Sequence, residues 1–93
     1  MRKVFSVGEI VESIKGRDKT NLFLIYRIEC DKIYLVNGDN RLICKPKIKN
    51  ANHIASTGVV VENLKQKILE GKNVFDAEIF SALKKYKQNL KGE

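Results

Sequence analysis

The sequence predicts a mainly β domain, a small curled antiparallel sheet or barrel, followed by two α-helices. Three observations lead to this prediction. Short apolar runs rich in β-branched residues alternate with polar turns over residues 1–56. Asn37-Gly38 supplies a strong hairpin signal within that part. After Thr57, apolar residues recur every three or four positions, which is typical of the buried face of a helix.

Length and composition fit one compact unit. The chain has 93 residues, of which 43% are hydrophobic and 31% are charged. A chain of this size can bury one core without disulfides or a metal. We therefore expect residues 1–56 to form the β part and residues 57–93 a helical hairpin packed on it.

The first two strands are expected over Gly8–Ile14 and Asn21–Glu29, joined by the basic turn Lys15–Lys19. Gly16 is free to adopt a positive φ within this turn. The second strand contains the run Leu22–Tyr26, which is apolar on both faces. Because a strand of this kind is buried on both sides, we expect another element to cover its outer face.

Three shorter strands complete the β part. The third is expected over Ile33–Val36, and Asn37-Gly38 predicts a type I′ turn leading into a fourth strand over Arg41–Lys45. Pro46 lacks an amide donor, so the fourth strand should end there or lie at an edge. A short fifth strand is expected over His53–Ser56.

Two helices are expected in the remainder. Thr57-Gly58 can cap a first helix over Val59–Glu70, and Gly71 fits its C-terminal cap. A second helix begins at Asp76, a good N-cap residue, and runs to about Lys87. Because their connection is short, the helices should form an antiparallel pair that packs on the second strand.

Charge points to a polyanionic partner. The net charge is +7 and the isoelectric point is near 9.5. Residues 1–56 carry eleven cations against six anions, whereas residues 57–93 carry seven against five. This surplus favours nucleic acid ahead of a membrane surface.

Enzymatic activity, a cofactor and a metal site are not expected. His53 lacks a GxSxG partner, and GRDKT lacks the glycine spacing of a phosphate-binding loop. Cys30 and Cys44 form no CxxC pattern and lie among apolar residues, where a free cysteine behaves as a small hydrophobe. We expect a cytoplasmic protein with reduced thiols, since neither a signal peptide nor a membrane span is recognisable.

Two basic groups are the candidate binding residues. The first is the turn formed by Lys15, Gly16, Arg17, Asp18 and Lys19. The second comprises Arg41, Lys45, Lys47 and Lys49, of which the three lysines would share one face of an extended chain. Such positions suit contacts to the phosphates of folded RNA. The aromatic residues read better as core than as a base-stacking surface.

The pattern Gly8-x-x-Val11-x-Ser13-x-x-Gly16-Arg17-Asp18-Lys19, followed by an apolar strand, resembles the KOW motif. Over most of its length the chain resembles small bacterial KOW-domain RNA-binding proteins related to the archaeal and eukaryotic L-fourteen-e ribosomal proteins. The resemblance continues through Asn37-Gly38-Asp39, Lys45-Pro46-Lys47, His53-Ile54 and the Asp76-Ala77-Glu78-Ile79 helix start. The chain carries Thr20 where the KOW pattern usually places a second glycine.

This resemblance implies an SH3-like barrel that binds RNA, usually ribosomal RNA, without catalysing a reaction. It assigns the contacts to Gly16, Arg17, Asp18, Lys19, Lys45 and Lys47. We therefore expect a ribosome-associated protein of translation with no membrane and no small-molecule substrate. Two alternatives remain open: a module that docks a ribosomal or transcription-machinery protein, and a DNA-binding barrel.

Overall fold

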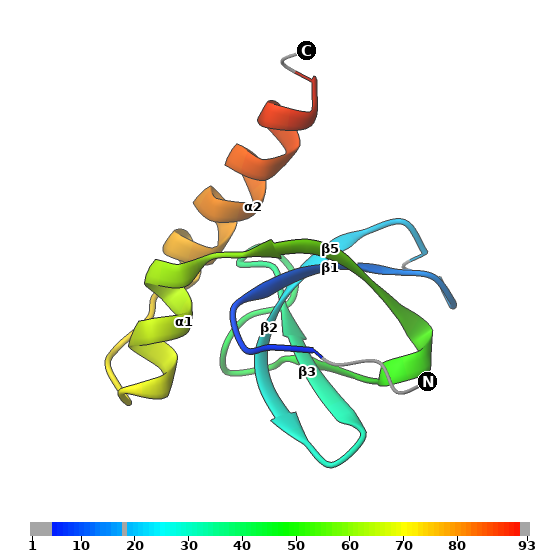
Figure 1. Ribbon diagram of the computed structural model, residues 1–93, viewed down its shortest axis with the longest axis horizontal. Helices are drawn as coiled ribbons and strands as arrows, with labels where there is room; N and C mark the ends of the chain where they lie inside the picture. The colour runs from blue at the N-terminus through cyan, green and yellow to red at the C-terminus, as the bar shows by residue number, and fades with distance from the viewer. Residues whose placement is uncertain (1–4, 18, 92–93) are drawn as a thin grey trace.

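The computed structural model describes residues 5–17 and 19–91. Its five strands form one antiparallel sheet in the order β4-β3-β2-β1-β5. The elements are β1 (Glu9–Ser13), β2 (Leu22–Glu29), β3 (Lys32–Val36), β4 (Lys47–Asn50), the 3-10 turn η1 (Ala51–His53), β5 (Ile54–Val60), α1 (Glu62–Leu69) and α2 (Asp76–Lys91). The prediction of a β-rich domain with C-terminal helices is confirmed (Figure 1).

The sheet is strongly bent but open. Register shifts interrupt the β1–β5 ladder after Ile10 and the β2–β3 ladder after Ile25. Shifts of this kind bend and twist the strands that carry them. Among the described residues β4 and β5 form no ladder with each other. The sheet therefore does not close into the barrel that the sequence predicted.

Two apolar clusters lie on opposite faces of the sheet, here called inner and outer. The inner face buries Val11, Phe23, Ile25, Ile33, Leu35 and Ile54. The outer face buries Ile10, Leu24 and Val36 against three residues of the helices, Leu64, Ile79 and Leu83. Successive strand residues point to opposite faces, so Phe23 and Leu24 enter different clusters. The prediction that β2 is buried on both faces, with the helices as its outer cover, is confirmed.

The fourth strand and the first helix differ from their predicted positions. Residues 41–45 form turns, and the fourth strand begins only after Pro46. β5 continues through Thr57 and Gly58 to Val60, so the boundary expected after residue 56 falls inside a strand. Pairing with β1 accounts for this extension, since Ile10 faces Val59 and its carbonyl also accepts a hydrogen bond from Thr57 Oγ1 at 2.6 Å. Long-range strand pairing outweighs the local signal for a helix cap.

Helix α2 is attached to the sheet through the loop at residues 37–46. Asp76, expected as an N-cap, instead accepts a hydrogen bond at Oδ1 from the Ile43 amide at 2.8 Å. Gly38 lies so close to α2 that an added Cβ would stand 2.2 Å from the Asp76 carbonyl oxygen. Asn37 does not have the positive φ that a type I′ turn requires, whereas Gly38 has a φ of 74°. The predicted hairpin dipeptide therefore acts as a docking point for the helix.

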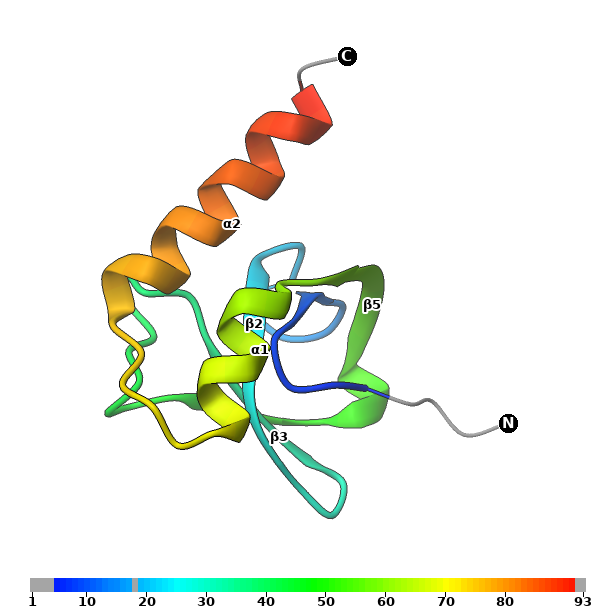
Figure 2. The same cartoon turned by 60° about the vertical axis from the view of Figure 1, so that its left-hand side comes forward.

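Glu78 joins the two helices and caps α2. Its carboxylate accepts hydrogen bonds from the Phe75 amide at 3.0 Å and from Lys67 Nζ of α1 at 2.6 Å. The helices thus meet at the start of α2, and α2 then extends past the sheet (Figures 1 and 2).

Replacing Glu78 with glutamine should lower stability near neutral pH but not in acid. The Lys67 hydrogen bond and the Phe75 amide hold the pKa of Glu78 below its ordinary value of 4.5. A carboxyl group whose pKa is lower in the folded state than in the unfolded state stabilises the fold at pH values above its unfolded-state pKa. This contribution is lost as the pH falls through the folded-state pKa. Thermal unfolding of both proteins at pH 7 and pH 3 should show a difference that shrinks below about pH 4.5.

Glu70→Gln is the matched control, because the Glu70 carboxylate forms an exposed ion pair with Lys72 at 3.1 Å. Exposed pairs of this kind contribute little. An equal Glu78→Gln effect at both pH values would contradict the assigned role of the carboxylate.

Candidate nucleic-acid interface

The turn between β1 and β2 presents its cations to solvent on a hydrogen-bonded backbone. The Thr20 amide donates to the Ser13 carbonyl at 2.7 Å, and the Lys19 amide donates to the Gly16 carbonyl at 3.2 Å. Gly16 has a φ of 92°, as its predicted role requires. The exposed turn residues are Lys15, Gly16, Arg17 and Lys19. The remaining predicted turn residue, Asp18, lies outside the described residues.

Thr20 also adopts the left-handed region, with a φ of 74°. A β-branched residue is strained there, because its Cβ crowds the backbone. The position that the KOW resemblance assigns to a glycine is thus one whose backbone favours glycine.

Replacing Thr20 with glycine should therefore stabilise the protein by about 0.5–1 kcal/mol, after the entropy cost of glycine in the unfolded chain. Urea unfolding measures the change in free energy of unfolding. Thr20→Ala is the control, since alanine keeps the Cβ and should recover less of the strain. A Thr20→Gly protein less stable than both would show that the turn is not strained.

The lysines of β4 lie beside this turn. Lys47 and Lys49 pair with Leu35 and Ile33 of the inner cluster, so both lysines share the inner face at the edge of the sheet. Lys49 Nζ donates a hydrogen bond to the carbonyl of Lys15 at 2.5 Å. Two basic segments that are distant in sequence therefore meet on one side of the molecule.

The remaining predicted site residues lie outside this row. Arg41 belongs to the loop before β4, where its amide donates to Asn37 Oδ1 at 2.9 Å. Lys45 is exposed in a turn closed by its own amide on the Leu42 carbonyl at 2.9 Å. The expectation that Lys45 continues the face of Lys47 and Lys49 along one strand is wrong, because Pro46 separates the turn from β4. We define the basic surface as Lys15, Arg17, Lys19, Lys47 and Lys49.

The aromatic residues of the β part follow the predicted core assignment with one exception. Phe23 is buried, and Phe5 and Tyr26 pack against the inner and outer clusters. Tyr34 is only partly buried, and Arg27 lies 5.7 Å from its ring centroid. Its hydroxyl donates to Glu29 at 3.0 Å, and this bond raises the pKa of Tyr34 above 10.0. Arg27 also pairs with Glu29, so the three side chains form a cluster on their own.

Cysteine and histidine show no catalytic arrangement in the described part of the chain. Cys30 and Cys44 are free thiols and exposed, so their expected apolar burial is wrong. His53 is partly buried in η1, where its carbonyl accepts the Ile14 amide at 3.0 Å. Residues 5–17 and 19–91 contain no group of three His, Cys, Asp or Glu side chains that would hold a metal ion. None of the described helices is long and apolar enough to cross a membrane.

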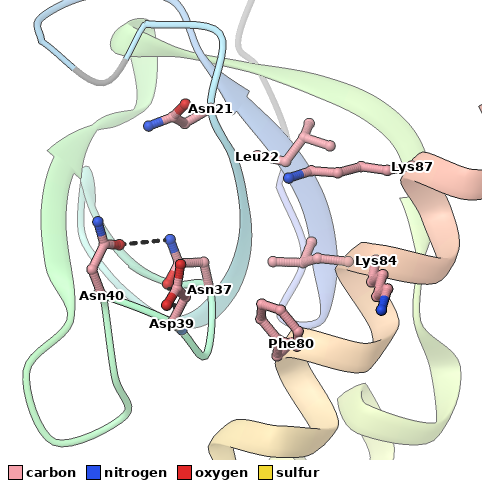
Figure 3. A pocket seen from close by; sticks show the side chains of 9 residues that line it. Asn21, Leu22, Asn37, Asp39, Asn40, Phe80, Lys84 and Lys87 are labelled. Carbon is pink, nitrogen blue, oxygen red and sulfur yellow. Dashed lines mark hydrogen bonds between the residues drawn. The ribbon is translucent and has the colours of Figure 1, made fainter.

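A second feature escaped the sequence interpretation, a pocket of about 350 Å³ between α2 and the loop after β3. Phe80, Lys84 and Lys87 line it from the helix, and Asp39 and Asn40 line it from the loop (Figure 3). The helix residues could have been grouped beforehand, because positions 80, 84 and 87 share one helix face. The loop residues could not, since only the docking of α2 brings them opposite Phe80.

Comparison with known proteins adds no relative. Neither the protein-family models nor the curated proteins that were searched contain a match to this chain.

Proposed function

We propose that this protein binds structured RNA, ribosomal RNA above all, through phosphate contacts from the basic surface. The observation that carries the proposal is the hydrogen bond from Lys49 Nζ to the Lys15 carbonyl. This bond joins the turn and the β4 lysines into one surface, so their cations can contact the phosphates of one RNA strand. In this role the protein is a cytoplasmic, ribosome-associated factor of translation and not an enzyme.

A KOW domain of the SH3-like type is the finer fold assignment that we propose. A bent five-stranded meander whose last strand returns beside the first supports it. So do the positive φ angles of Gly16 and Thr20, which fall where the KOW pattern usually has two glycines. Both features belong to the backbone and do not depend on the charged side chains. They therefore support the fold assignment independently of the basic surface.

The salt dependence of binding tests the mechanism. With about four to six phosphates contacted, the logarithm of the observed binding constant should fall with log salt concentration with a slope of about −3 to −5. Fluorescence anisotropy on a labelled fragment of ribosomal RNA between about 50 and 200 mM salt would then show a loss of affinity of roughly 60- to 1,000-fold.

Duplex DNA of equal length is the competitor in this assay. Weaker competition by DNA than by unlabelled RNA supports recognition of folded RNA, whereas stronger competition favours a DNA-binding domain. An affinity that hardly changes with salt would contradict the phosphate mechanism.

A further inference from the structure

The pocket between α2 and the loop after β3 has a wall that is fixed before any ligand arrives. Asn37 Oδ1 accepts the amides of Asp39 and Arg41, both at 2.9 Å, and Asn37 Nδ2 donates to Asn40 Oδ1 at 2.9 Å. Gly38 presses this loop against the backbone of α2 at Asp76 and Phe80. The loop and the helix thus hold their side chains in a defined arrangement across the pocket.

Several polar groups of the pocket have no partner within residues 5–17 and 19–91. The Asp39 carboxylate, the Asn40 NH₂ group and the Asn21 side-chain amide form no hydrogen bond or ion pair with the described residues. The same holds for the ammonium groups of Lys84 and Lys87. Figure 3 shows the Lys87 side chain extended from α2 toward Leu22, across the pocket from the two loop residues.

An aromatic ring completes the lining. Phe80 is 45% exposed, although it lies on a helix whose neighbouring residues Ile79 and Leu83 are buried. An exposed aromatic face stacks well on a nucleobase. A volume of about 350 Å³ lies at the lower end of ligand pockets, and this suits a single nucleotide.

These groups lead us to infer that the pocket holds one unpaired guanine of the bound RNA, an inference that rests on the proposed function. Guanine presents two adjacent donors, N1–H and N2–H₂, which one carboxylate can accept together. Adenine, cytosine and uracil each place an acceptor beside a donor on the same edge, so the Asp39 carboxylate would face an unfavourable lone pair. The amides of Asn21 and Asn40 can donate to the O6 and N7 acceptors of guanine.

The positive and negative side chains of the pocket have different roles. The lysines at positions 84 and 87 follow Phe80 by four and seven residues, on the same face of α2. They can contact the phosphates on either side of a stacked base, while Asp39 on the opposite wall repels phosphate and accepts base N–H groups. Base recognition on one wall and phosphate contact on the other define the orientation of the nucleotide.

Titration of the full chain with single nucleotides tests the inference. The probes are GMP, AMP, CMP, UMP and ribose 5-phosphate, and the readout is the ¹⁵N spectrum of the Asn21 and Asn40 side-chain amides. GMP should shift these signals with an affinity at least about tenfold above that of the other probes, as expected for two charge-assisted hydrogen bonds. Equal binding by ribose 5-phosphate, or no shift with any nucleotide, would overturn the guanine site.

Two variants separate stacking from base recognition. Phe80→Ala should weaken GMP binding roughly tenfold, whereas Phe75→Ala, at a phenylalanine that is 64% exposed and outside the pocket lining, should not. Asp39→Asn keeps the backbone amide bonded to Asn37 and should reduce the preference for GMP to less than about threefold. A guanine preference that survives Asp39→Asn would overturn the assignment of the carboxylate.

Binding of a ribosomal RNA fragment distinguishes this inference from the proposed function. Tight, salt-dependent RNA binding that is unchanged by Phe80→Ala and Asp39→Asn would overturn the pocket alone. GMP binding at the pocket without any affinity for structured RNA would overturn the proposed function.

Discussion

Replacing Gly38 with alanine should destabilise the protein by about 2–5 kcal/mol and release α2 from the sheet. An added Cβ would lie 2.2 Å from the Asp76 carbonyl oxygen and 2.7 Å from the Phe80 amide nitrogen. Both are backbone atoms of α2, so a change of side-chain rotamer cannot relieve the overlap. The φ of 74° adds the strain of a left-handed alanine.

Gly58→Ala is the matched control for this experiment. Gly58 has a similar φ of 80°, but an added Cβ would meet no described atom within 4 Å. The Gly58→Ala protein should therefore lose only about 1–2 kcal/mol of free energy of unfolding, which is the cost of a left-handed alanine. Urea unfolding gives both free energies, and hydrogen exchange at the Ile43 amide reports whether the bond to Asp76 is kept. Equal losses in the two variants would show that the close approach of α2 does not determine the effect.

Replacing Arg17 and Lys19 together with alanine should reduce affinity for ribosomal RNA roughly 100-fold, since each charged contact contributes about 1.5 kcal/mol. Both side chains are exposed, so the midpoint of unfolding should stay near that of the unmodified protein. The salt slope of the observed binding constant should become shallower by about two. Fluorescence anisotropy and ribosome co-sedimentation measure these changes.

The control removes the same charge from the helical part, through Lys72→Ala and Lys85→Ala. Both side chains are exposed and lie outside the basic surface, so RNA affinity should fall only slightly. Undiminished ribosome association of the Arg17 and Lys19 variant would favour the protein-docking alternative. A groove between α1 and α2 lined by Val61, Leu64 and Ala82 would then be the first surface to test.

The elements with a strong local pattern were predicted from the sequence. The first three strands differ from their predicted bounds by one residue at each end at most, and both helices are present. The two-sided burial of β2 was also predictable, because a continuous apolar run fits a strand covered on both faces.

Elements that depend on distant partners were misplaced. Thr57 and Gly58 have the chemistry of a helix cap but lie inside β5, at the register shift of its ladder with β1. Asp76 bonds to Ile43 instead of capping α2. Cys30 lies in an apolar context in the sequence, yet it is exposed in the turn after β2 with a φ of 56°. For Thr57 and Asp76 a contact from elsewhere in the fold outweighs the local preference. Cys30 is exposed because it lies in the two-residue turn between the paired residues Glu29 and Lys32.

The basic turn itself is a local feature, and the sequence alone determined its position, its cations and its need for positive φ angles. Only the tertiary structure decided which other cations join it. Lys49 reaches Lys15 because the sheet bends, and because the His53 carbonyl ties η1 to Ile14 at the end of β1. Arg41 and Lys45 remain in the loop bound to α2. Proximity of residues far apart in the chain depends on sheet curvature and helix docking, which local propensity does not specify.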